Sequence, residues 1–256
     1  MMETIGIIAA MTQESNALLR YIKGWEQSGR GSFSEKHFAL SGRRCVLVTS
    51  GMGVRRASEA ARYLVEMSQA RLLVSFCIAG AVEAELEIGD VVAVEATCRL
   101  DEGVAGPALR LESWSDTARE AIAQVLARRG RRLYTGTAIT TGGSQVREDR
   151  LGGIMHPILE METSGIAQAA TEKGIPLLAL RAISDGPRAP IPLDLSEVMD
   201  EDANLRAGRL LMAIVRQPRI LLQLGRMMRN TQIAADHAAL ALVAALSQAT
   251  IRHRRS

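Results

Sequence analysis

Aromatic residues are scarce in this sequence, at 3% of 256 residues. Proteins that bind single-stranded nucleic acid usually stack the bases on aromatic side chains. The net charge of +3 is too small to replace such a platform by electrostatic attraction alone, although basic residues gather in the runs 128–132 and 251–256. We therefore predict that nucleic acid is not a partner of this protein.

Cysteine is also scarce, and long apolar runs are absent. Cys45, Cys77 and Cys98 have neither CxxC spacing nor the spacing of a zinc site, so we predict reduced, mostly buried thiols, no metal and no cofactor. No apolar run reaches the roughly 18 residues of a membrane-spanning helix. The opening "MMETIGIIAAMTQES" lacks the basic segment of a secretory signal. These features together predict a cytoplasmic protein.

Hydrophobic residues make up 47% of the chain, enough for a sizeable core. Short runs rich in valine, leucine and isoleucine alternate with segments whose apolar residues recur at helical spacing. The predicted strands lie within 4–10, 43–53, 71–82, 90–98, 132–143 and 175–187, and the predicted helices lie at 56–67, 118–130 and 166–174. Nearly continuous apolar strands that alternate with helices indicate an α/β fold with a mainly parallel sheet covered on both faces.

Polar residues stand where the predicted strands end. In parallel sheets, ligands bind beyond the carboxyl ends of the strands. A helix N-terminus explains Glu14 taken alone, and a local turn explains Asp185 taken alone. The convergence of Glu14, Glu162 and Asp185 on one edge of the sheet nevertheless predicts a ligand site there.

A glycine-rich segment, "TSGMGVRRAS", links a predicted strand to a predicted helix. The backbone N–H groups of Gly51 and Gly53 could cradle an anion there, with Arg55 and Arg56 beside them. The segment is neither a P-loop nor a GxGxxG motif, so an ordinary strand-to-helix turn is the alternative.

The segments "IGIIAAMTQE", "TSGMG", "IAGAVEAELEIGDVV", "EMET" and "LRAISD", in this order, resemble the nucleoside phosphorylase superfamily, which includes the methylthioadenosine/S-adenosylhomocysteine nucleosidases. The resemblance covers roughly residues 3–190. It implies a three-layer αβα sandwich with a central mixed sheet, cleavage of the N-glycosidic bond of a purine nucleoside, and a homo-oligomer. We place the catalytic domain at 1–200 and a C-terminal helical extension, packed on the same domain, at 201–256.

The resemblance also implies roles for single residues. Glu162 aligns with the glutamate that binds the ribose 2′- and 3′-hydroxyls. A carboxylate suits this role because its two oxygens can accept hydrogen bonds from a vicinal diol. Met161 would pack against the sugar, with Glu160 in support. Asp185 aligns with the acid that protonates N7 of the purine, and Glu14 with the base that activates water.

Two segments depart from the nucleosidase pattern. "CIAGA" stands where nucleosidases read "GSAGG", so Ile78 replaces a serine. Gln145 replaces an aromatic residue of the base-binding segment, where backbone groups of Gln145 and Val146 would bind the purine edge. The remaining predicted substrate contacts are Ala79, Gly80 and Ser184.

The nucleophile is open between water and phosphate. Ser75 and Ile78 stand where the phosphorylases carry an arginine and a Ser or Thr for phosphate, which favours hydrolysis. Phosphorolysis that uses Arg55 and Arg56 is one alternative. A non-catalytic nucleoside-binding protein and an interaction protein that uses the alanine-rich tail are the others.

A narrower resemblance involves "SFCIAGAVEAELEIGD" and the tail "RQPRILLQLGRMMRNTQIAADHAALALVAAL". Both are similar to the hopanoid-associated branch, whose members remove adenine from adenosylhopane. The tail predicts one or two amphipathic helices in which leucines alternate with arginines. Such helices would pack in the core or at a dimer contact, or form a basic surface that lies against a membrane.

Overall fold

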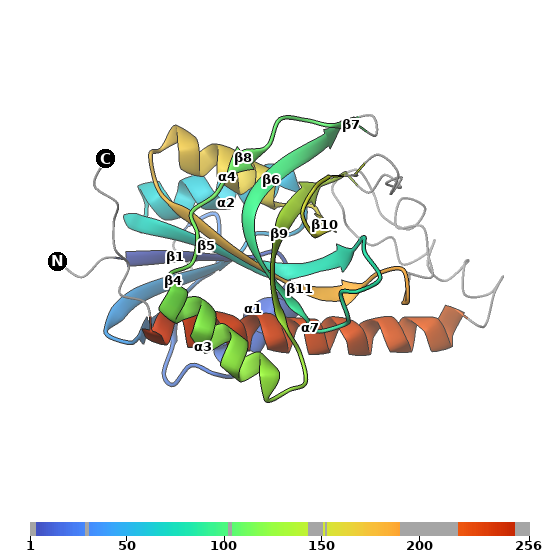
Figure 1. The fold of residues 1–256 in the computed structure, drawn as a ribbon. Coiled ribbons are helices and arrows are strands. Elements are labelled where there is room, and N and C mark those ends of the chain that lie inside the picture. Colours follow the sequence, from blue (N-terminus) through green and yellow to red (C-terminus); the bar gives the residue numbers. More distant parts are fainter. Residues whose placement is uncertain are drawn as a thin grey trace.

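The computed structural model describes residues 4–28, 31–101, 104–142, 151, 153–189 and 220–248, with only the backbone at 101, 104 and 220–223. A central sheet carries helices on both faces, α2 and α4 on one and α1, α3 and α7 on the other (Figure 1). This arrangement confirms the predicted three-layer sandwich. The helices are α1 (Thr12–Leu19), α2 (Val54–Glu66), α3 (Asp116–Ala127), α4 (Thr163–Glu172) and α7 (Ile220–Gln248).

The sheet is mixed, with the strand order β10-β9-β6-β11-β5-β1-β4-β3-β2. Strands β4, β1, β5 and β11 run parallel to one another. The strands are β1 (Thr4–Ala9), β2 (Glu26–Ser28), β3 (Glu35–Leu40), β4 (Arg43–Thr49), β5 (Ala70–Ala81), β6 (Val91–Asp101), β7 (Val104–Ala105), β8 (Leu109–Arg110), β9 (Leu133–Thr140), β10 (Pro157–Glu160) and β11 (Leu177–Asp185).

One end of the sheet closes on itself. β10 pairs in parallel with β9 and also antiparallel with the end of β5, where Leu159 lies opposite Gly80. Strands β5, β10, β9, β6 and β11 therefore form a closed ring. Because β10 runs opposite to β5, its last residues are brought back along the end of β5. Glu160 to Glu162 thus reach the predicted site because β10 closes the ring. They do not reach it as the carboxyl end of a strand parallel to β5.

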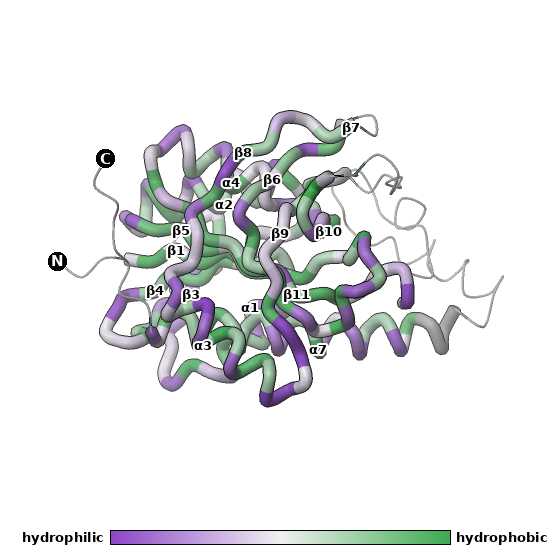
Figure 2. Tube along the Cα trace, viewed as in Figure 1, coloured by the Kyte–Doolittle hydropathy of each residue, from purple (hydrophilic) through white to green (hydrophobic). Residues whose placement is uncertain are grey.

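The core has two layers because the central strands are buried on both faces. Successive side chains of a strand point to opposite faces, and Ile7 and Ile8 of β1 accordingly belong to different clusters. Ile7 lies in the cluster that holds Leu18 of α1, and Ile8 in the cluster that holds Leu64 of α2. Figure 2 shows hydrophobic residues concentrated along the central strands. Full burial of one such side chain stabilises the fold by roughly 1.5–3 kcal/mol.

The edge strands β2 and β3 were not predicted from the sequence, and neither were the short strands β7, β8 and β10. β2 and β3 continue the sheet beyond β4 as antiparallel strands. Of the six residues of β3, only Phe38 is buried, so this strand lacks the continuous apolar run that marks the central strands. The cysteines meet the expectation, because Cys45, Cys77 and Cys98 are free and buried.

The tail forms the long helix α7, which packs in the core. Its buried face is mostly alanine, with Leu242 and Leu246, and lies in the same cluster as residues of α1 and α3. At its surface, Asp236 accepts hydrogen bonds from Arg20 and Tyr21 of the α1 region. These contacts support the core-packing interpretation of this part of the tail. No helix within the described ranges is long and apolar enough to cross a membrane.

The predicted division of the chain at residue 200 falls in 190–219, outside the described residues, so it stays a prediction. The first four residues of the quoted tail segment, 216–219, also lie outside the described residues.

Candidate active site

Glu14 lies in the first turn of α1, directly after β1, and is fully buried. Its Oε2 accepts a hydrogen bond from the N–H of Met11 at 2.8 Å, the contact expected of an acid at a helix start. Its Oε1 accepts from the N–H of Ile78 in β5 at 2.9 Å, which a helix-capping role does not require. Burial raises the pKa of Glu14, while the backbone donors oppose the rise. The raised pKa suits a general base near neutral pH.

Glu160 ends β10 and is buried. Its Oε2 accepts from the backbone N–H of Glu162 at 3.0 Å and from that of Thr163 at 2.7 Å. It therefore satisfies the first free N–H groups of α4, which a helix start otherwise leaves without partners. Its Oε1 accepts from the hydroxyl of Thr140 at the end of β9. Glu160 thus joins the start of α4 to the end of β9, and its place among the substrate residues stays a prediction.

Glu162 occupies the N-cap position of α4, but its side chain does not cap that helix. Instead, its Oε1 accepts from the N–H of Gly53 at the start of α2, at 2.9 Å. Burial, together with the nearby charge of Glu160, raises the pKa of Glu162 to about 8. A carboxyl group with this pKa can hold or release a proton near neutral pH, so it can both accept from and donate to neighbouring hydroxyls.

Arg181 of β11 is a buried residue of this region that the sequence analysis did not single out. It is fully buried, and its Nη2 donates to Glu160 Oε2 at 3.2 Å, to Thr163 Oγ1 at 2.7 Å and to Ser75 Oγ at 2.9 Å. Losing one partner of such a pair leaves an uncompensated buried charge. A lone arginine within the apolar run "LLALRAIS" was the signal that could have revealed it.

Asp185 ends β11 and is partly buried. Its Oδ1 accepts from the hydroxyl of Ser184 at 2.6 Å, and burial raises its pKa. A Cβ atom added at Gly80 would lie 2.6 Å from Asp185 Oδ2. Glycine at position 80 therefore lets the Asp185 carboxyl approach the β5 backbone, beside the predicted substrate segment.

The structure brings most of the predicted substrate residues together along the end of β5. Ile78 and Gly80 are in contact with Glu14 and Asp185 as described, and Ala79 accepts a weaker bond from Ser184 through its carbonyl oxygen, at 3.3 Å. The half-buried Met161 lies between Glu160 and Glu162. The remaining two predicted residues, Gln145 and Val146, lie outside the described residues.

The predicted anion segment has a different environment. Gly51 and Gly53 both have positive φ angles, 82° and 98°, which explains why glycine stands there. The N–H of Gly53 binds the Glu162 carboxylate. The exposed Arg55 forms an ion pair with Glu59 at 3.3 Å. Arg55 and Arg56 line an open hollow of about 650 Å³, together with Ser50 and other residues of α2.

Three carboxyl groups thus lie around the end of β5, each held differently. Glu14 and Glu162 are fixed by backbone N–H groups, and Asp185 by a neighbouring hydroxyl. Burial raises the pKa of each. Groups with raised pKa values in a shared environment can exchange protons with a ligand at neutral pH, so the arrangement suits acid–base chemistry.

Comparison with known proteins gives a family match over most of the chain. The model of the Phosphorylase superfamily matches residues 4–216. A 5′-methylthioadenosine/S-adenosylhomocysteine nucleosidase from Actinobacillus succinogenes is 27% identical over 195 residues, which cover 71% of this chain and 85% of that protein. The nucleosidase of the same name from Colwellia psychrerythraea is 25% identical, covering 83% of this chain and 95% of that protein.

Solved structures show the same fold at lower sequence identity. A structure of the Colwellia psychrerythraea nucleosidase in complex with adenine has a TM-score of 0.71 and 19% identity, covering 97% of this chain and 96% of that chain. The native structure of the futalosine hydrolase of Helicobacter pylori has a TM-score of 0.69 and 15% identity, covering 96% and 98%.

Proposed function

This chain belongs to the phosphorylase superfamily and is an enzyme of that family, and we propose that it cleaves the N-glycosidic bond of a purine nucleoside with water as nucleophile. The observation that carries the proposal is that Glu14 binds the N–H of Ile78 and Asp185 lies against Gly80, both in β5, while Glu162 follows β10, which pairs with the end of β5. Relatives named as nucleosidases support it, because they match over 71% or more of this chain.

The bond that breaks joins C1′ of the ribose to N9 of the purine. Its electron pair moves to the base, and Asp185 provides a proton at N7, so that the base leaves as a neutral molecule. Burial, which raises the pKa of Asp185, favours the protonated form that this step requires. The ribose becomes positively charged as the base leaves, and the buried carboxylates nearby stabilise that charge.

Water then attacks C1′ and gives its proton to Glu14. The two backbone N–H groups of Met11 and Ile78 hold the carboxylate of Glu14 in one orientation. Glu162 binds the two ribose hydroxyls, and its bond to Gly53 fixes the position of one of its oxygens. Glu160 and Arg181 do not touch the substrate in this proposal. They hold the chain segment that carries Glu162.

Water is favoured over phosphate for two reasons. Ile78 offers no hydroxyl where the phosphorylases bind phosphate, and the N–H of Gly53 is engaged by Glu162. Arg55 and Arg56, the alternative anion ligands, line a hollow on the α2 surface. A phosphate dianion buried beside three carboxyl groups would be costly, because the nearby buried cation, Arg181, is already paired with Glu160.

The experiment is an assay of adenine release from adenosine derivatives across a phosphate titration, with the sugar product identified by mass. We expect free ribose products and a rate independent of phosphate. A sugar 1-phosphate, or a rate that rises from zero with phosphate, would overturn the hydrolytic proposal and direct the search to Arg55 and Arg56. Failure to release any base, from a folded protein that still binds nucleosides, would identify a non-catalytic binding protein.

For the substrate we propose an adenine nucleoside with an apolar 5′ substituent, such as adenosylhopane. Support for adenine comes from the Colwellia relative, which was solved with adenine bound. Support for a lipid substituent comes from the resemblance of the tail to the hopanoid-associated branch, and from the start of α7, where Arg226, Met228 and Arg229 are exposed. Such a surface suits a peripheral contact with a membrane.

These finer proposals have direct tests. Adenosylhopane in mixed micelles should be cleaved with a higher kcat/KM than methylthioadenosine, and the opposite preference would contradict the lipid substrate. Co-sedimentation with anionic vesicles tests the membrane contact. Light scattering after size-exclusion chromatography tests the expected homo-oligomer.

A further inference from the structure

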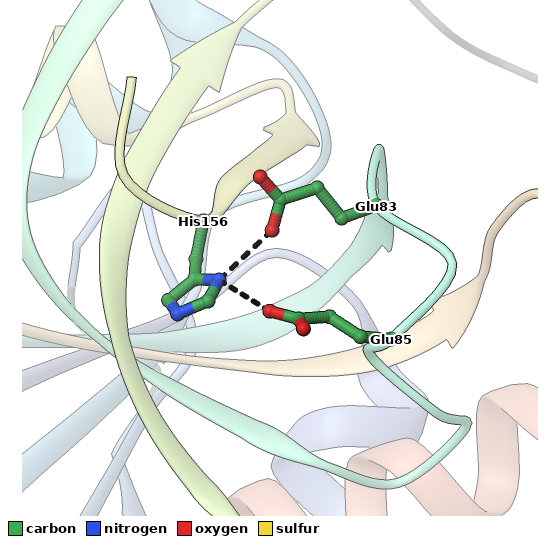
Figure 3. Close-up of side chains that lie close together, drawn as sticks. All are labelled: Glu83, Glu85 and His156. Atoms are coloured by element: carbon green, nitrogen blue, oxygen red, sulfur yellow. Dashed lines mark hydrogen bonds and ion pairs between the residues drawn. The ribbon is translucent and has the colours of Figure 1, made fainter. Parts of the chain in front are cut away.

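Away from the carboxyl groups described above, Glu83, Glu85 and His156 form a separate cluster. Glu83 and Glu85 follow β5, and His156 precedes β10 (Figure 3). The Nδ1 atom of His156 lies 2.8 Å from Glu83 Oε2 and 3.1 Å from Glu85 Oε1. Figure 3 shows both carboxylates pointing at this one nitrogen. The side chains keep 29%, 39% and 58% of their surface exposed for His156, Glu83 and Glu85, so solvent reaches the cluster.

The position of His156 is set by the strands around it. The antiparallel pairing of β10 with β5 continues in a bond from the N–H of Val82 to the carbonyl oxygen of Pro157 at 3.3 Å. A Cβ atom at position 136 of β9 would lie 2.5 Å from the carbonyl oxygen of His156, so Gly136 permits this approach. The ring of Tyr134 meets the imidazole edge-on at 5.2 Å. Strand pairing therefore fixes the backbone at His156, and Tyr134 packs against the imidazole beside the two glutamates.

The charges of the cluster do not balance. Nδ1 of an imidazole carries at most one hydrogen, so it serves one carboxylate well and the other poorly. Even a protonated His156 leaves one negative charge, and within the described residues neither Glu83 nor Glu85 has another ion-pair partner. By contrast, Glu87 of the same loop pairs with Arg131 at 2.9 Å.

The spacing of the three side chains fits a metal ion. Ions such as Zn²⁺ bind imidazole nitrogen and carboxylate oxygen at about 2.0–2.2 Å, so adjacent ligand atoms are roughly 3 Å apart at right angles and about 3.4 Å apart in a tetrahedral site. The two N···O distances, 2.8 and 3.1 Å, are close to the right-angled spacing, and all three ligand atoms lie within 4.8 Å of one another. One imidazole and two carboxylates suit Zn²⁺ or Mn²⁺.

We propose that Glu83, Glu85 and His156 bind one divalent transition-metal ion, with water completing its coordination. The ion neutralises the excess negative charge and joins the loop after β5 to the start of β10. These two strands carry Gly80 and Glu160, so the ion would clamp the frame of the candidate active site without taking part in the reaction.

The test is calorimetric titration of the full-length protein with ZnCl₂ and with MnCl₂, without nucleoside. We compare the wild type with Glu83→Gln, Glu85→Gln and His156→Asn. Asparagine is chosen because His156 has a φ of 37°, and asparagine tolerates such angles better than most residues. Glu87→Gln is the matched control, since it removes a carboxylate from the same loop but outside the cluster.

We expect one ion per chain in the wild type and in Glu87→Gln. The three cluster variants should bind it at least about tenfold more weakly, since loss of even an outer partner of a ligand typically costs 10–100-fold. Added metal should raise the Tm of the wild type and of the control only. Equal affinity in Glu85→Gln and wild type would place the ion elsewhere. Absence of binding at millimolar metal would reduce the cluster to an ion pair. Either result would overturn the proposal, and neither depends on nucleoside cleavage.

Discussion

The buried carboxyl groups of Glu14 and Glu162 have different hydrogen-bond donors from the carboxyl group of Asp185 at the end of β11. Both oxygens of Glu14 accept backbone N–H groups, and an oxygen of Glu162 does the same. Asp185 is only partly buried, and within the described residues its one hydrogen-bond donor is the hydroxyl of Ser184. Backbone N–H groups stabilise the ionised form of a carboxyl group and fix its orientation.

The difference separates two chemical tasks. A base that accepts a proton from water works best when it is ionised and immobile, which describes Glu14. An acid that gives a proton to a ligand needs a raised pKa and an oxygen that is not already engaged, which describes Asp185. Burial raises both pKa values, but only Glu14 has backbone donors that lower it again. The four predictions below test this division.

The largest effect is expected from Glu14→Gln. The amide cannot accept the proton from water. Its NH₂ group would also face one of the two backbone N–H groups that donate to the carboxylate, so the side chain would lose its orientation. We expect kcat to fall by about 10⁴-fold, the upper end of the range for general acid–base catalysis. Binding of adenine, measured by calorimetry, should stay nearly unchanged. A variant that retains more than a tenth of wild-type turnover would show that Glu14 is only a structural acid.

Asp185→Asn should have a smaller effect, because the amide keeps the shape and the bond from Ser184 but has no proton to give. We expect kcat to fall by about 10²–10³-fold, measured at a matched folded fraction. The exposed Asp116→Asn, at the start of α3, is the control and should leave kcat unchanged. Substrates with a better leaving group than adenine should recover part of the loss, since they need less protonation. Full activity in Asp185→Asn would remove the acid from the proposal.

Glu162→Gln tests whether the buried region also recognises ribose. Above the Glu162 pKa of about 8, where this carboxyl group is ionised, the variant should bind nucleosides with both hydroxyls more weakly by roughly 1.5–3 kcal/mol, the usual contribution of a hydrogen bond to a charged group. Binding of 2′-deoxynucleosides should change much less. Inhibition constants for matched ribo- and deoxyribo-analogues give the measurement. An equal loss for both sugars would mean that Glu162 supports the fold but does not bind the diol.

The smallest effect concerns stability and pH. The pKa of Glu162 is about 8 in the folded protein, above the ordinary glutamate pKa of 4.5, so between these values the folded state holds a proton that the unfolded state has released. The free energy of unfolding therefore falls as pH rises between these two values. Between about pH 6 and pH 7, this group contributes a loss on the order of 1 kcal/mol.

Denaturant unfolding of the wild type and of Glu162→Gln across this range isolates the contribution. The wild type should lose more stability than the variant, which lacks the titrating group. Parallel stability profiles would show that Glu162 is ionised in the folded protein at neutral pH. Its carboxyl group would then be more exposed to solvent than the structure shows, as that of Asp185 is.

Local patterns in the sequence were sufficient for the central elements. The run at 71–82 was predicted as a strand and is β5 at Ala70–Ala81, and the helix predicted at 166–174 overlaps α4 at Thr163–Glu172. Apolar periodicity reports burial on one or both faces, which is a local property. The family resemblance added the three-layer fold, which the structure confirms, and the roles of Glu14, Glu162 and Asp185, which stay predictions.

Local sequence patterns could not predict the edge strands or the antiparallel pairing of β10 with β5. β10 has only four residues, too few to show direction or partner, and its pairing with β5 depends on ring closure. Glu160 and Glu162 have different hydrogen-bond partners in the structure. Two glutamates separated by one residue carry no local signal that would distinguish those partners.

What the sequence by itself determined was the order of strands and helices and the chemical types gathered at their ends, because hydrophobic burial imprints a period on neighbouring residues. Only the tertiary structure decided which of these groups meet. Arg181 reaches Glu160 across 21 positions of the chain, and His156 reaches Glu83 across 73. Contacts at such separations depend on how whole strands pair and pack, and no spacing between adjacent residues encodes them.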